Sequence, residues 1–248
     1  MTASRRALVL VALLLLAAPL EAAITVVTSD SAGSSDNNAV TTAGVNSGSS
    51  TGMVVAVAWY GPSGTPTVSD SPTNTLVAIA GATICHSGSG TCTGLWYATS
   101  ITTNGSHTVT ASLTSGFPSI AVVFVAGIHL SSALDQVNEA EVTAQTIEPG
   151  SVTPGEAGEI VCTGATAGLS ESWASIDDGF TLHQNVANSG NHFGLGLACL
   201  IQTSAAAANP TWTVAGGVDD LTATVATFKE AAGGTCVGRF SLLGAGGC

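Results

Sequence analysis

Short runs of Thr, Ser, Val and Ala, interrupted by Gly or Pro about every ten residues, constrain this chain more than any other feature. Small and β-branched residues favour pleated strands, and Gly and Pro end them. Charged residues make up only 8% of the chain, so the long polar helix formers are scarce. The pattern predicts an all-β fold, an antiparallel two-sheet β-sandwich whose strands are joined by short turns.

Two of these runs are apolar at every position. Residues 53–60 and 120–128 carry apolar side chains on both alternating faces, so we expect central strands that are covered on both sides. Trp59 and Tyr60, at the end of the first run, are then expected in the core.

Two further segments carry local signals. Asn104 and Gly105 predict a hairpin turn, because both residues tolerate positive φ. Residues 131–144 are the one helix candidate, which Ser131 or Ser132 would cap, and an irregular crossing is the alternative.

The chain begins with the three-part pattern of a secretory signal. Residues 1–6 are basic, residues 7–20 form an uncharged apolar run, and small residues follow at Ala22 and Ala23. We predict a cleaved signal peptide at 1–22, a single β-sandwich domain at 23–230 and a Gly-rich tail at 231–248. An uncleaved N-terminal anchor is the alternative. No later apolar run is long enough to span a membrane.

Six cysteines follow the leader, and an even count in an exported chain indicates disulfides. Sequence alone allows 15 connectivities for six cysteines. Spacing favours two local bridges, and alternation then turns the remaining two thiols toward the core, where they either bridge two strands or stay buried and reduced. A metal site is disfavoured because no paired Cys-x-x-Cys spacing occurs. The favoured pairs are Cys85 with Cys92, Cys162 with Cys199, and Cys236 with Cys248.

Positive charge is nearly absent after the leader. Arg5 and Arg6 lie within it, which leaves Lys229 and Arg239, and the whole chain carries a formal net charge of -12. Nucleic acid and anionic membranes are held mainly by Lys and Arg contacts, so both are excluded as partners. Together with the secretory leader and the six cysteines, this charge pattern predicts a protein that is secreted or held at the cell surface.

Loop carboxylates make calcium the one candidate cofactor. Carboxylate oxygens are hard ligands, and extracellular calcium occupies even weak sites. The alternative is turn chemistry, because Asp and Asn also bond their own backbone. The candidate ligands are Asp30, Asp36, Asp177, Asp178, Asp219 and Asp220.

Exposed aromatic rings decide whether the chain binds sugars, because planar rings stack on pyranose faces. Trp173 is the best exposed candidate, since it precedes Asp177 and Asp178 in a polar stretch, but a lid over the core is the favoured interpretation of a single loop Trp. Glu139 and Glu141 would share a face on a strand, as a paired-carboxylate hydrolase requires, but no aromatic strand surrounds them.

Several segments resemble a loose family of secreted bacterial and phage-associated β-sandwich proteins. They are AWYGPSGTPTVSDSPTNT (58–75), GLWYAT (94–99), HTVTASL (107–113), NHFGLGLACLIQ (191–202), NPTWT (209–213) and ATFK (226–229). The resemblance spans residues 24–229 and implies a jelly-roll-like sandwich at an exported or surface location. It implies no catalytic residues.

Two functions follow as expectations. The first is a non-enzymatic extracellular module that adheres to a glycan or cell surface, or builds an envelope or filament, with oligomers formed through the tail. The second is a polysaccharide hydrolase or lyase on a jelly-roll scaffold. A concave face with two carboxylates and two or more aromatics would favour the enzyme.

Overall fold

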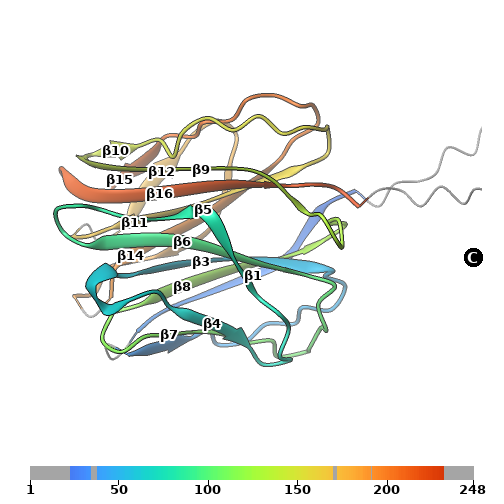
Figure 1. The fold of residues 1–248 in the computed structure, drawn as a ribbon, viewed down its shortest axis with the longest axis horizontal. Coiled ribbons are helices and arrows are strands. Elements are labelled where there is room, and N and C mark those ends of the chain that lie inside the picture. The colour runs from blue at the N-terminus through green and yellow to red at the C-terminus, as the bar shows by residue number, and fades with distance from the viewer. Residues whose placement is uncertain (1–22, 35–37, 170–171, 191, 232–248) are drawn as a thin grey trace, which may run out of the picture.

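The computed structural model describes residues 23–34, 38–169, 172–190 and 192–231. They form sixteen strands and one 3-10 turn, η1 (Gly61–Ser63), and every strand pairing is antiparallel. The described residues contain no α-helix. The predicted all-β, antiparallel fold is therefore confirmed (Figure 1). The predicted leader, the tail from 232 onward and Asp36 lie outside the described residues.

The first eight strands form a five-stranded sheet and a three-stranded sheet. In spatial order the larger sheet contains β1 (Thr25–Gly33), β8 (Ser119–Ala126), β3 (Gly52–Tyr60), β6 (Thr91–Thr99) and β5 (Val77–Cys85). The smaller contains β2 (Ala39–Thr41), β7 (Val109–Ser112) and β4 (Thr67–Asp70).

The last eight strands repeat this arrangement, because adding eight to each strand number converts the first pair of sheets into the second. The larger sheet contains β9 (Leu134–Ala144), β16 (Asp219–Phe228), β11 (Ile160–Ala167), β14 (Gly194–Ile201) and β13 (Thr181–Val186). The smaller contains β10 (Thr146–Ile147), β15 (Trp212–Val214) and β12 (Trp173–Ile176). We call β1–β8 and β9–β16 the two repeats.

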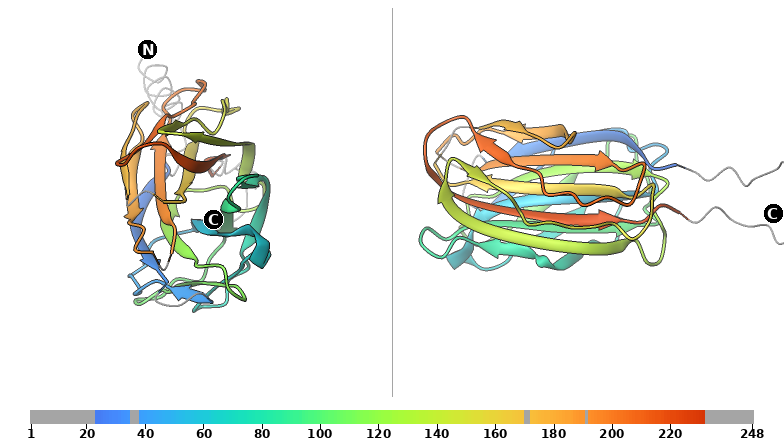
Figure 2. Two further views of the ribbon diagram at one scale, coloured as in Figure 1. Left: turned by 90° about the vertical axis from the view of Figure 1, so that its left-hand side faces the viewer. Right: turned by 90° about the horizontal axis from the view of Figure 1, so that it is seen from above.

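The four sheets are layered with the two large sheets in the middle (Figure 2). One core lies between the large sheets and joins side chains of both repeats, such as Val54 and Leu95 with Leu197 and Phe228. Each small sheet covers the outer face of its large sheet over a second or third core, centred on Trp59 in one repeat and on Trp212 in the other. The predicted two-sheet sandwich is thus the inner half of a four-layer molecule.

This layering explains the strands that are apolar on both faces. β3, β8 and β11 are buried along nearly their whole length, because each packs on the partner sheet on one side and on a small sheet on the other. The prediction of central strands at 53–60 and 120–128 is confirmed. Tyr60 is an exception, since it ends β3 and is 37% exposed.

Side chains close the edges of the two large sheets against each other. At one edge the Glu139 carboxylate on β9 accepts a hydrogen bond from the Thr83 backbone N–H on β5, at 2.7 Å. At the other edge the Gln184 amide on β13 bonds Ser29 and Ser31 on β1, at 2.7 Å each. Covered edges prevent uncontrolled strand addition by other chains.

β1 begins and β16 ends at one end of the molecule, on the right in Figure 1 and in the right-hand view of Figure 2. We call this end the terminal pole and the opposite end the distal pole. The register places the ends of β1, β3 and β11 and the start of β16 at the distal pole.

Two local predictions are wrong. Residues 134–144 form strand β9 rather than a helix, because β9 pairs with the edge of the buried strand β16 from Ala144 opposite Asp219 to Leu134 opposite Phe228. Asn104 and Gly105 do lie at a turn, in which the Asn104 side chain accepts the Ser106 N–H. The flanking strands β6 and β7 belong to different sheets, so the turn is a crossing and not a hairpin.

Two of the three predicted disulfides are present. Cys85 is bonded to Cys92 between β5 and β6, and Cys162 is bonded to Cys199, its direct partner across β11 and β14. Cys236 and Cys248 lie outside the described residues. Disulfides are typical of oxidising compartments, which fits an extracellular protein. The described residues contain no helix long and apolar enough to cross a membrane.

Candidate functional site

Two adjoining hollows lie at the distal pole, between the loops of the two repeats. The larger, of about 660 Å³, is lined by Phe117 from the β7–β8 loop and by residues 168–169, 188–190 and 192–193 of the second repeat. The smaller, of about 230 Å³, is lined by Tyr60 and by the start of β16. Gly168, Leu169 and Phe193 line both hollows. We call the two together the distal cleft.

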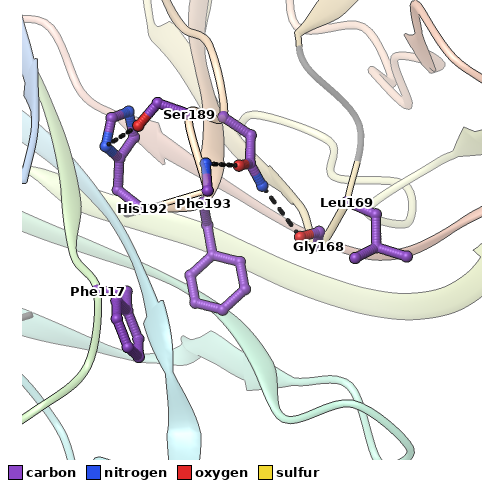
Figure 3. Close-up of a pocket in the computed structure, with 8 residues that line it drawn as sticks. Phe117, Gly168, Leu169, Ser189, His192 and Phe193 are labelled. Carbon is purple, nitrogen blue, oxygen red and sulfur yellow. Dashed lines mark hydrogen bonds between the residues drawn. The ribbon is translucent and has the colours of Figure 1, made fainter.

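Apolar side chains are exposed in this cleft. Leu169 is 85% exposed, and Tyr60 and Phe117 are each 37% exposed. Figure 3 shows Phe117, Phe193 and Leu169 around the same hollow. Phe117 has a φ of 49°, in the left-handed region that costs a bulky residue on the order of 1 kcal/mol or more. The β7–β8 loop therefore holds the Phe117 ring at the surface in a strained backbone conformation, which the conformational preference of phenylalanine does not favour.

The polar wall of the cleft is fixed by hydrogen bonds between loops. The Asn188 side-chain amide donates to the Gly168 carbonyl at 3.0 Å and accepts the Gly190 N–H at 2.7 Å. His192 Nε2 lies 2.8 Å from the Ala187 carbonyl oxygen. A Cβ atom at Gly33 would clash with the His192 ring, so a side chain at the end of β1 would displace that ring from its present position. The wall is thus built before any ligand arrives.

Two carboxylates line the smaller hollow, and they differ in role. Asp219 is buried, and its two oxygens accept the Leu169 N–H at 3.0 and 2.9 Å, so it anchors the β11–β12 loop. The Asp220 side chain is 31% exposed. Its Oδ1 accepts the Thr143 hydroxyl at 2.7 Å and lies 3.5 Å from His86 Nε2. Consecutive strand residues point to opposite faces, so the two do not form a facing pair.

The expectation that Trp173 is an exposed sugar-binding ring is wrong. Trp173 is 2% exposed, its Nε1–H donates to the Ala165 carbonyl at 3.1 Å, and its ring contacts Trp212 edge-on at 5.1 Å. Its sequence neighbours concealed this. The next residues of β12 are exposed on the outer face of the small sheet, whereas the Trp173 side chain points into the core on the inner face. Asp177 and Asp178 follow the opposite end of β12, so the structure separates them from Trp173 and from the distal cleft.

Three of the predicted calcium ligands, Asp30, Asp177 and Asp219, accept backbone N–H groups. Asp30 accepts the Ser31 and Gly44 N–H groups, each at 2.9 Å, and Asp177 accepts the Thr211 N–H at 2.6 Å. Asp178 has a φ of 56° in the turn before β13. Within the described ranges, no three His, Cys, Asp or Glu side chains are grouped closely enough to hold a metal ion. Asp and Asn turn chemistry accounts for these clusters.

A Ser-His-Asp arrangement that the sequence did not reveal lies at the terminal pole. His107 Nδ1 is 2.9 Å from Ser47 Oγ, and its Nε2 is 2.7 Å from Asp70 Oδ2. All three residues are buried, and Ser47 Oγ also bonds the backbone N–H and carbonyl of Asn104. No substrate reaches this hydroxyl. The three side chains tie together three loops and do not form a catalytic triad.

Comparisons with known proteins return nothing: no family model, no curated protein and no solved structure matches the chain. The resemblance to secreted bacterial and phage-associated β-sandwich proteins therefore remains an expectation based on the segments quoted above.

Proposed function

We propose that the protein is a secreted, non-enzymatic adhesion module that binds a glycan in the distal cleft. The observation that carries the proposal is the cleft itself, in which partly exposed aromatic rings and a loop amide line two adjoining hollows. Aromatic faces stack on sugar rings, and fixed polar groups orient the hydroxyls. Tyr60 and Phe117, from the first repeat, face a wall built by the second repeat.

The position of the cleft supports an adhesive role. Both ends of the described domain lie at the terminal pole, about one strand length from the cleft (Figure 2). A chain that is attached to a cell, filament or second copy through its terminal pole would present the cleft outward. The distal pole combines a hollow with exposed aromatic side chains, Tyr60 and Phe117.

Binding to a glycan array tests the proposal directly. Mature protein (residues 23–248) should bind at least one glycan, and the Phe117→Ala and Tyr60→Ala variants should each lose about tenfold in affinity, as expected for one stacking ring. Leu169→Ser should weaken the same binding. Leu130→Ser is the matched control, because Leu130 is 54% exposed and follows β8, whose end lies at the terminal pole. Absence of all glycan binding, or equal loss with Leu130→Ser, would refute the proposal.

The hydrolase alternative has one specific observation in its favour. The smaller hollow contains two carboxylates and two aromatic rings, Asp219 and Asp220 with Tyr60 and Phe193. Asp219 is nevertheless bonded to the Leu169 N–H through both oxygens, and a retaining or inverting pair must face one glycosidic bond from two sides. Release of reducing ends from a bound polysaccharide, abolished by Asp220→Asn, would establish the enzyme in place of the adhesin.

A further inference from the structure

The charged side chains that line the distal cleft are all acidic. Asp219 and Asp220 lie in the smaller hollow, and Glu141 accepts the Ser87 N–H beside it. Among the described residues Lys229 is the only Lys or Arg, and it follows β16 at the opposite pole, where its Nζ is 3.3 Å from Asp135. No Lys or Arg of the described domain therefore offsets the acids of the cleft, and the histidines there, His86 and His192, carry a positive charge only when protonated.

Of the two acids that line the smaller hollow, Asp219 is buried, and Asp220 is the one that a ligand can reach. Its side chain is 31% exposed, and its Oδ1 is already held by the Thr143 hydroxyl and lies near His86 Nε2. These contacts fix the orientation of the carboxylate before a ligand binds. A preoriented carboxylate beside a partly exposed aromatic ring, here Tyr60, is a standard arrangement for binding an organic cation.

The same charges act against the other classes of sugar. A uronate or sulfate group would be repelled by Asp220 and would meet no Lys or Arg in the described part of the cleft. A neutral sugar would stack on the rings but would bring no positive charge to the Asp220 carboxylate. An ammonium group satisfies both the carboxylate and the ring face.

We infer that the distal cleft binds a polysaccharide that carries free amino groups, such as a deacetylated hexosamine chain. The inference rests on the proposed glycan-binding function and adds the chemical class of the sugar. The amine lies against Asp220 and Tyr60, and the neighbouring sugar ring stacks on the apolar side chains of the larger hollow. The net charge of -12 also attracts a polycation from a distance and speeds its association.

Calorimetric titration of the mature protein (residues 23–248) with three hexasaccharides at pH 6 tests this inference. The probes are hexa-glucosamine, its fully N-acetylated counterpart and hexa-galacturonate. We expect hexa-glucosamine to bind at least tenfold more tightly than the acetylated hexamer and galacturonate not to bind. Raising the salt from 0.05 to about 1 M should remove most of the preference, because the screening length falls to about 3 Å.

Two variants with the same change in net charge separate a local contact from general attraction. Asp220→Asn should lower the affinity for hexa-glucosamine about tenfold and leave the acetylated hexamer unchanged. Asp178→Asn, in an exposed turn that follows the end of β12 away from the cleft, should change neither. An Arg239→Gln variant should behave like the parent if the tail takes no part.

The possible failures are distinguishable. Equal affinity for the two hexosamine chains, or equal effects of Asp220→Asn and Asp178→Asn, would overturn the amino-sugar inference while the glycan-binding proposal stands. Tighter binding of galacturonate would also overturn it. Binding of no glycan on the array or in the titration would refute both.

Discussion

The two disulfides should contribute unequally to stability, because they close loops of different length. Cys162 and Cys199 are 37 residues apart, and Cys85 and Cys92 are 7 apart. The loop-closure entropy that each bond removes from the unfolded chain corresponds to about 4 kcal/mol for the longer loop and about 2 kcal/mol for the shorter one. Loss of the buried Cys162–Cys199 pair also removes side-chain volume from the core between the repeats. We therefore expect the C162A/C199A variant to lose at least 2 kcal/mol more than C85A/C92A.

Urea denaturation, followed by the fluorescence of the four tryptophans, measures this difference. All variants are made in a C236A/C248A background, so that tail thiols cannot exchange with the two bonds. With reducing agent present, the parent should approach the stability of a variant that lacks both bonds, and that variant should not respond. Equal losses in the two double variants, or a larger loss for C85A/C92A, would refute the loop-length reasoning.

Two further predictions concern buried ionisable groups. Asp70→Ala leaves His107 buried without its carboxylate, so the free energy of unfolding should fall by about 3–5 kcal/mol. The control Asp177→Ala, at an exposed turn, should lower it by about 1 kcal/mol. Equal losses in urea denaturation would contradict the role assigned to the Ser47–His107–Asp70 network. Burial raises the pKa of Glu159 above its ordinary value of 4.5, so the folded state binds this proton more tightly than the unfolded state, and the stability it contributes at low pH is lost as pH rises through the folded value. Glu159→Gln should therefore stabilise the protein near pH 7 by more than about 0.5 kcal/mol and lose this advantage below pH 4.5; an advantage that is independent of pH would show that the cause is not the charge.

The features predicted correctly from sequence are those set by local physics. The period-two pattern and the doubly apolar runs identified β3 and β8, and alternation turned Cys162 and Cys199 inward. The four-layer arrangement and the internal repeat were missed, because Val, Ala and Thr replace one another freely in corresponding strands such as GMVVAVAWY in β3 and IVCTGATA in β11. The two repeats share the same order of hydrogen-bonded strands, and this order cannot be recognised from the residue types alone.

The candidate site was missed for a related reason. Its residues come from loops of both repeats, and only the packing of the two large sheets brings Phe117 close to Phe193 and Tyr60 close to Asp220. Sequence reasoning chose Trp173 because it lies in a polar stretch beside Asp177 and Asp178, but Trp173 and Trp212 fill the core under a small sheet. The one available signal was Phe117 between Gly116 and Pro118, an aromatic residue that strand patterning does not require.

Each disulfide joins strands within one repeat, so the connection between β8 and β9 is the single covalent link between the repeats in the described domain. One repeat alone would expose the inner face of its large sheet to water and would need a second copy to cover it. This is the architecture expected from the fusion of two genes for a homodimeric ancestor. A chain cut after residue 129 should accordingly yield two fragments that reassemble from separate expression, and fragments that never copurify would count against that origin.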